Sequence, residues 1–328
     1  IHLNSIRALT FMYIVIENLL QRLVTGIMVG SIYGLLCTGL GMIFGVIRVI
    51  NFAQGELMML GMYATMFVGG LLVLWLSVGS ALGAYLAIFV VAAALGAVGW
   101  LIQKHLISYV SGFKASNSEN QGHFAQLILT LGLSLVISNG ALILFGSSPR
   151  TVQSPLASSS LTIGPFSEGD IMIFLNQARG IGCLVAIAVS IVLYLIVQKT
   201  RLGITMRAAA DNPKAATLMG IDIEKSYATA FAIGTAATAI AGGLIAMYYP
   251  FHPYTGFEFV IIMYAGVVLG GMGSMLGAFW GGFTMGLVQQ LSTYFLPFQL
   301  QNATIFVLFL VVVLLRPQGL FGKNVERA

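Results

Sequence analysis

The sequence predicts an all-α, polytopic membrane protein with about eight to ten membrane segments in one bundle. Of its 328 residues, 58% are hydrophobic and only 8% are charged, whereas soluble domains carry about 25% charged residues. So few charges could not cover a soluble globule of this length. Apolar runs near the ~20 residues that cross a bilayer as a helix also recur along the chain. We therefore expect a single transmembrane domain over residues 1–328.

Ten apolar runs are candidates for the membrane segments. The 257–273 run is short and glycine-rich, which also fits a broken or re-entrant helix. The first run follows Arg7 as in a signal peptide, but polar residues rather than a small-residue cleavage site come after it, so we expect it to be retained. The candidates are 8–21, 23–47, 56–77, 79–102, 124–146, 180–198, 226–249, 257–273, 275–294 and 301–315.

Lysine and arginine set the expected orientation, because they gather in cytoplasmic loops. The 199–225 loop and the C-terminal tail are both rich in them, and four candidate segments separate the two. The 103–123 loop, two segments before residue 199, falls on the same side, which we predict to be cytoplasmic. The Ser/Pro-rich 147–179 loop then faces the periplasm.

Composition and motifs argue against several functions. The net charge of +5 comes without a basic block interleaved with aromatics, so nucleic acid is not expected as a partner. The two cysteines and four histidines lack metal-ligand spacing, and no phosphate-binding G-x-x-x-x-G-K-[ST] motif occurs. No Ser/His/Asp set or carboxylate pair is arranged for catalysis. We expect a non-enzymatic chain that binds no metal or cofactor itself.

A polar stretch, "VINFAQGELMML" (49–60), interrupts two long apolar runs. Asn51, Gln54 and Gly55 would permit a broken helix, which is tolerated in a membrane only against protein or a wet cavity. Glu56 would then lie in the first turn of the next helix, where the helix dipole favours a carboxylate, and Asn51 would cap that helix or precede it. Broken helices often bind transported solutes. A short interfacial loop explains the same residues as well.

The 199–225 loop contains "ITMRAAADNPKAATLMG" (204–220), which has helix-forming composition with Pro213 as a break or first-turn residue. Its alanines, Ala208–Ala210, Ala215 and Ala216, would present a thin surface of small residues. Arg207, Asp211 and Lys214 beside them could orient a partner protein that receives the helix in a groove. An interfacial linker helix against lipid headgroups is the alternative.

Several motifs resemble one family. Lys214-Ala215-Ala216-x-x-x-Gly220 is similar to the Glu-Ala-Ala-x-x-x-Gly signature of ABC importer permeases, with a lysine in place of the acidic residue. "INFAQGELMMLGMY" (50–63) looks like the "INFAHGE" segment of branched-chain amino-acid ABC permeases of the LivH type, with Gln54 where that family has histidine. The stretches "RAAADNPKAATLMGID", "VVLGGMGSMLGAFWGG" and "LLRPQGLFGK" resemble the same family in the same order, from about Thr25 to Lys323.

The resemblance implies a membrane subunit of a bacterial ABC importer in the inner membrane. Its implied partners are a second, LivM-like permease, two cytoplasmic ATPase subunits that hold ATP and magnesium, and a periplasmic solute-binding protein. The implied solutes are branched-chain or other neutral amino acids, with urea, short amides or aromatic acids as alternatives. The predicted ATPase-docking residues are Arg207, Ala208, Asp211, Asn212, Lys214, Ala215, Ala216 and Gly220. The predicted translocation-pathway residues are Asn51, Phe52, Gln54 and Glu56.

Two other classes remain open from the residues alone. An ion-coupled carrier would use Glu56 or Glu258 as its coupling acid, and an intramembrane enzyme would need a buried nucleophile or metal cluster. The hydroxyls of Thr130, Ser134 and Ser138 recur at four-residue spacing and would line a pathway or bond neighbouring helices. The 205–220 segment favours the ABC permease.

Overall fold

A computed structural model describes the chain apart from residues 1, 49, 77–78, 111–118, 153, 165–171, 298–299, 317 and 322–328. Apart from its loops and two paired strands, the described part is helical. Its helices are α1 (His2–Ile47), α2 (Ala53–Leu76), α3 (Ser80–Ile102), the π-helix η1 (Gln103–Ile107), α4 (Ser108–Val110), α5 (Glu119–Phe145), α6 (Pro155–Ser158), α7 (Gln177–Lys199), α8 (Arg201–Asp211), α9 (Pro213–Leu218), α10 (Ile223–Ala246), α11 (Thr255–Gly270), α12 (Met275–Phe295) and α13 (Gln301–Leu315).

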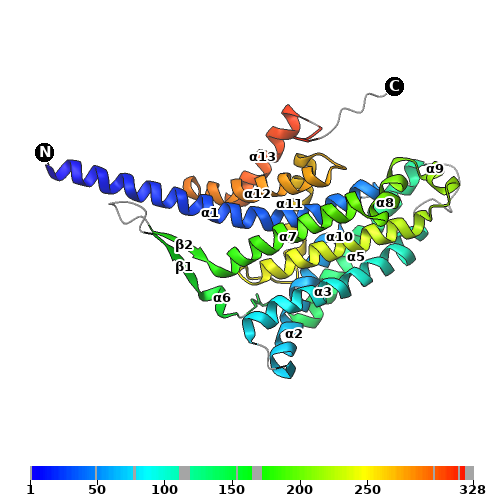
Figure 1. The fold of residues 1–328 in the computed structure, drawn as a ribbon, viewed down its shortest axis with the longest axis horizontal. Coiled ribbons are helices and arrows are strands. Elements are labelled where there is room, and N and C mark those ends of the chain that lie inside the picture. The colour runs from blue at the N-terminus through cyan, green and yellow to red at the C-terminus, as the bar shows by residue number, and fades with distance from the viewer. Residues whose placement is uncertain are drawn as a thin grey trace.

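The first two predicted segments, 8–21 and 23–47, are wrong as separate spans, because both belong to α1. This helix has 46 residues and is about 70 Å long at about 1.5 Å per residue, roughly twice the hydrocarbon thickness. Its N-terminal part projects beyond the rest of the bundle (Figure 1). The polar residues near position 20 therefore do not interrupt the helix, because this part of α1 extends beyond the rest of the bundle.

Within the described residues, 6 helices are long and apolar enough to cross a membrane: α1, α2, α3 with its π-helical extension, α5, α7 and α10. Two shorter apolar helices, α11 and α13, add to them. The chain is thus a multi-pass, all-α membrane protein, as the sequence predicts. The 257–273 run forms α11 and the glycine turn after it, and α11 is one of the shorter helices.

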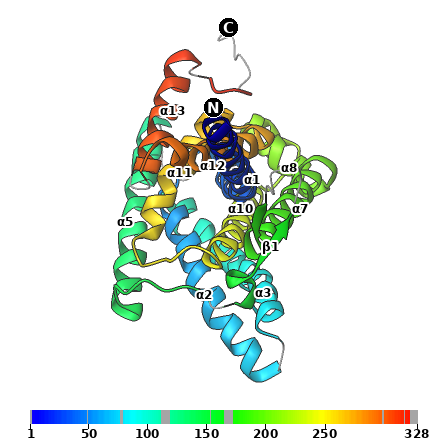
Figure 2. The same ribbon diagram turned by 90° about the vertical axis from the view of Figure 1, so that its left-hand side faces the viewer.

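The centre of the bundle is built on α1 and α10. In the apolar stretch of each helix that could cross a membrane, 83% of the residues are buried in α1 and 78% in α10. The share is only 17% in α5 and in α7. Figure 2 shows α5 and α7 on opposite sides of this centre. Glycines allow α1 to approach its neighbours closely: a Cβ on Gly30 would meet the Phe283 carbonyl of α12 at 2.6 Å, and one on Gly39 would meet the Gly234 carbonyl of α10 at 2.7 Å. This is the small-residue packing typical of membrane helices.

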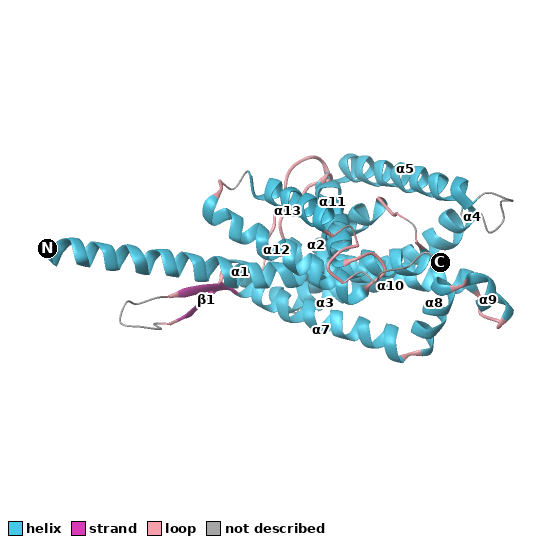
Figure 3. Cartoon of the chain, turned by 90° about the horizontal axis from the view of Figure 1, so that it is seen from above, coloured by secondary structure: helices cyan, strands magenta, loops and turns pink. Residues whose placement is uncertain are grey.

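The lysine- and arginine-bearing segments meet at one end. Ile107 of η1 and Met206 of α8 share a buried cluster with Ile47, the last residue of α1. At that same end, Gly319 in the C-terminal tail lies against Gly271, which follows α11. The paired strands β1 (Ser160–Ile163) and β2 (Ile173–Asn176) lie at the other end (Figure 3).

Candidate functional site

The polar stretch between α1 and α2 lies inside the bundle. Asn51, Gln54 and Glu56 are each no more than 1% exposed. Gln54 contacts Thr238 of α10, which is about 22 Å along that helix from its first residue, at about 1.5 Å per residue. These three side chains are therefore enclosed by protein rather than exposed to lipid headgroups, and the break between α1 and α2 reaches the level of Thr238 in α10.

The two amides of the break bond one another and α10. Asn51 Oδ1 accepts a hydrogen bond from the Ala53 amide at 3.1 Å and so closes the turn before α2. Asn51 Nδ2 donates to Gln54 Oε1 at 2.9 Å. Gln54 Nε2 donates to Thr238 Oγ1 at 2.7 Å. These bonds satisfy polar groups that would otherwise be costly in an apolar interior.

Glu56 is the acidic member of this group. It lies in the first turn of α2, and its carboxylate lies against Gly256 in the first turn of α11, where an added Cβ would meet Oε2 at 2.5 Å. Ser134 of α5 donates to Oε1 at 3.4 Å, whereas Oε2 has no partner among the described residues. The positive ends of two helix dipoles at this place would favour a negative charge on Glu56, and its Oε2 atom has no hydrogen-bond donor among the described residues.

The backbones of α2 and α11 touch beside Glu56. A Cβ on Gly55 would overlap the carbonyl oxygen of Gly256, so only glycine allows this approach. Phe52 stacks at a tilt on Tyr264 of α11, with ring centroids 5.4 Å apart. We call the buried set Asn51, Gln54, Glu56, Ser134 and Thr238 the mid-bundle polar cluster.

The hydroxyl face of α5 packs on the break. Thr130 Oγ1 donates to the Ile50 carbonyl at 3.3 Å and Ser134 to Glu56, while Ser138 bonds its own helix at the Ser134 carbonyl. Ser134 thus bonds a neighbouring helix, Thr130 bonds the break, and Ser138 bonds its own helix. Sequence reasoning missed Thr238 and Gly256, although the hydroxyls of the 226–249 run and the glycine directly before the 257–273 run could have suggested them.

The predicted docking segment forms two helices, α8 and α9. Thr200 Oγ1 caps α8 at the Gly203 amide, and Asn212 Oδ1 caps α9 by accepting from the Ala215 amide at 3.0 Å. Pro213 occupies the first turn of α9, as predicted, and Gly220 follows with φ +82°. Arg207 Nη1 donates to Gln198 Oε1 at 2.9 Å and ties α8 to the end of α7.

The surface of this segment differs from the expected one. Ala209 and Ala216 are buried with Ile223 in a small cluster, so they position α9 and cannot contact a partner. The expectation of an alanine surface is wrong for these two residues, because α9 folds back onto the start of α10. The outward face instead carries two large apolar side chains, Leu218 at 89% exposed and Met219 at 83%. Exposed polar residues flank them: Arg207, Asp211, Asn212 and Lys214.

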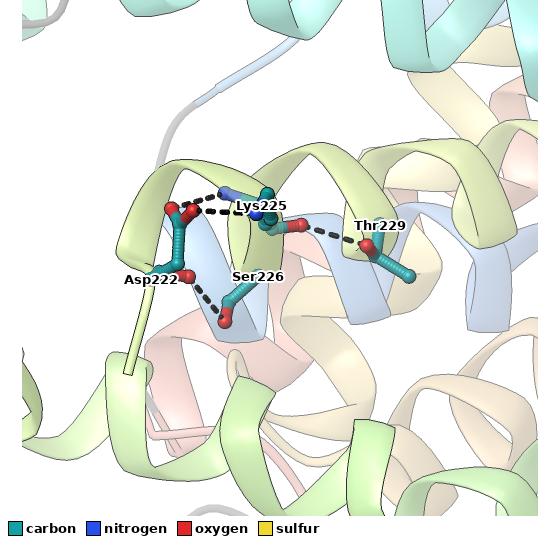
Figure 4. A network of polar contacts seen from close by, with 4 residues as sticks. All are labelled: Asp222, Lys225, Ser226 and Thr229. Carbon is teal, nitrogen blue, oxygen red and sulfur yellow. Dashed lines mark hydrogen bonds and ion pairs between the residues drawn. The ribbon is translucent and has the colours of Figure 1, made fainter. Parts of the chain in front are cut away.

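Four residues at the start of α10, directly after the docking segment, form a local network of polar contacts (Figure 4). Asp222 Oδ1 accepts from the Lys225 amide at 3.0 Å, and its other oxygen lies 3.3 Å from Lys225 Nζ. Ser226 Oγ donates to the Asp222 carbonyl at 2.9 Å, and Thr229 to the Lys225 carbonyl at 2.7 Å. The hydrogen bond from the Lys225 amide holds the pKa of Asp222 below its usual value.

Glu258 lies apart from the cluster and pairs with His252 at 3.7 Å. It is 45% exposed at its side chain, so the structure does not bring Glu56 and Glu258 together. Among the described residues, no group of three or more His, Cys, Asp or Glu side chains could hold a metal ion.

A multi-pass bundle with a buried polar break between two helices is typical of membrane transport proteins. The comparisons place it more closely: the family model for the branched-chain amino acid transport system permease component matches residues 22–315. The chain belongs to this permease family.

Curated relatives agree with the family model. The high-affinity branched-chain amino acid transport system permease protein LivH of Escherichia coli K12 is 30% identical over 93% of this chain and 96% of its own length. The permease protein BraD of Pseudomonas aeruginosa is 30% identical over 94% and 97%. The probable LivH of Methanocaldococcus jannaschii is 29% identical over 88% of both chains. No solved structure matches.

Proposed function

We propose that this chain is the permease subunit of a binding-protein-dependent ABC importer in the bacterial inner membrane, and that it carries branched-chain or other neutral amino acids. The family match along nearly the whole chain supports the transport role. The observation that carries the mechanism is the mid-bundle polar cluster, which supplies hydrogen-bonding groups and a single carboxylate inside the bundle, with no buried ion pair among the described residues.

In the proposed mechanism, α8 and α9 dock on an ATPase subunit through Leu218 and Met219, with the flanking polar residues orienting the contact. Because Ala209 and Ala216 pack on Ile223, a movement of α9 would pass directly to α10, which carries Thr238 of the cluster. The ATPases would thereby bias one of two arrangements of the bundle by their differential affinity for them. ATP and magnesium would bind the partner subunits only.

Reconstitution tests the proposal. The chain is purified with a second permease and two ATPase subunits, placed in proteoliposomes, and supplied with the solute-binding protein and labelled leucine. We expect uptake that requires ATP and every component, and that falls when Gln54 is replaced by leucine. Uptake by this chain alone under a proton or sodium gradient, abolished by Glu56→Gln, would instead establish an ion-coupled carrier. ATP-driven uptake of urea or an amide but not of leucine would correct the solute class.

A further inference from the structure

A cavity of about 730 Å³ opens at the end of the bundle opposite the docking segment. It lies between the first residue of α3, α6 with the described residues just before it, the first turn of α7 and the residues that follow α10. Pockets for small molecules have volumes of about 300–1,000 Å³, so a free amino acid fits it readily. This cavity is separate from the mid-bundle polar cluster, none of whose residues line it.

Arg179 is the cationic group of the cavity wall. Its backbone amide donates to Asn176 Oδ1 at 3.1 Å, which fixes it in the first turn of α7. Its guanidinium lies over the Tyr248 ring, 5.0 Å from the centroid. Its Nε is buried without a hydrogen-bond partner, and the guanidinium has no ion pair with any described residue. A planar guanidinium with unused donors is suited to a carboxylate.

The rest of the wall suits the other parts of an amino acid. The Tyr248 hydroxyl is also buried without a partner among the described residues. Ser80 and Thr151 add hydroxyls that can accept from an ammonium group. Val152, Pro155 and Met247 provide an apolar side of the same cavity.

We propose that this cavity is an outer binding site for the free amino acid, which Arg179 holds by its carboxylate. The proposal rests on the proposed function, since it takes the transported solute as the ligand. Met247 and Tyr248 directly follow α10. Thr238 lies inside the same helix, about 12 Å before its last residue, Ala246, at about 1.5 Å per residue. The solute would therefore meet Arg179 before it reaches the mid-bundle polar cluster.

The test is binding of labelled leucine to the complete transporter in nanodiscs, without the solute-binding protein. We expect the wild type to bind leucine and Arg179→Gln to bind it at least tenfold more weakly. Arg179→Lys should retain part of the affinity, and Lys104→Gln, which removes a charge at the other end, should bind as the wild type. 4-Methylpentanoate, which keeps the carboxylate, should compete, whereas leucinamide, which lacks it, should not.

Three results would overturn the proposal: a wild type that transports leucine with its binding protein but binds none alone, unchanged binding in Arg179→Gln, or equal competition by leucinamide. Loss of docking by the binding protein with unchanged leucine binding would assign the cavity to protein docking. Tyr248→Phe, which removes only a hydroxyl, provides a second reading if Arg179→Gln does not fold. Failure of the proposed function itself appears separately, as absence of ATP-driven leucine uptake in the wild type.

Discussion

The side-chain amide of Gln54 donates a 2.7 Å hydrogen bond to the hydroxyl of Thr238, and this bond joins the break before α2 to the middle of α10. Both side chains are fully buried. A helix start that would otherwise leave polar groups in an apolar interior is thereby anchored to one of the two central helices. The position of the break therefore depends on a side chain 184 residues away in the sequence.

This bond is testable by a double-mutant cycle of Gln54→Leu and Thr238→Val. We expect a coupling free energy of about 0.5–1.5 kcal/mol, in the range of hydrogen bonds between membrane helices. The measurement is thermal unfolding of the purified chain in detergent. Thr235→Val, one turn earlier on α10, is the control, because the Thr235 hydroxyl is buried without a partner among the described residues. Strictly additive effects would show that the bond does not form.

The contact between α2 and α11 predicts opposite effects of alanine at two glycines of α2. Gly55→Ala should destabilise the chain by about 1–3 kcal/mol, because the added methyl group overlaps the Gly256 carbonyl. Gly70→Ala has no atom within 4 Å of the new methyl group and should be neutral or stabilising by up to about 1 kcal/mol, since alanine favours helix. Melting temperatures of the two variants check this. Equal shifts in both would contradict the close approach.

Leu218 and Met219 predict the strength of docking. Replacing both with serine should weaken binding of the ATPase subunits at least fivefold, which corresponds to about 1 kcal/mol for the pair, because buried apolar anchors carry much of the binding energy of an interface. Titration of ATPase subunits onto the permease in nanodiscs measures it. Tyr109→Ser is the matched control, an 82% exposed apolar side chain in α4 at the same end. If the double variant binds as tightly as the wild type, the contact lies elsewhere.

Asp222 predicts a pH-dependent start of α10. Because its folded-state pKa is lowered, its charged form stabilises the folded chain above the ordinary aspartate pKa, and this contribution is lost as the pH falls through the lowered value. Asp222→Ala should cost about 1 kcal/mol of unfolding free energy near neutral pH. The cost should shrink as the pH falls toward 3.

Unfolding of the wild type, Asp222→Ala and Asp222→Asn across this pH range measures the effect. Asparagine keeps the oxygen that accepts from the Lys225 amide, so the difference between Asn and Ala isolates the cap from the charge. A wild-type advantage that grows at acid pH would contradict the sign of the shift.

The sequence by itself predicts the class of this protein. The lengths of its apolar runs and the scarcity of charge predict membrane-spanning helices. In a bilayer, a helix satisfies the hydrogen bonds of its own backbone within one segment. The predicted runs 124–146, 180–198, 226–249 and 275–294 agree with α5, α7, α10 and α12 to within about five residues at each end. Pro213 and Gly220 likewise indicate from the sequence where α9 begins and ends. Proline fixes a helical φ angle in the first turn, and glycine permits the positive φ angle after the last turn.

Only the tertiary structure decided the features that depend on packing between distant helices. Composition predicts two membrane segments before residue 48, but the structure has one continuous helix, α1, in their place. Composition cannot distinguish the two, because a helix can extend beyond the bilayer. Nothing near Ala216 in the sequence indicates that it is buried, because its cover comes from Ile223 and Ala209 in neighbouring helices. The depth of Asn51, Gln54 and Glu56 was open for the same reason: their bonding partners, Ser134 and Thr238, lie on α5 and α10.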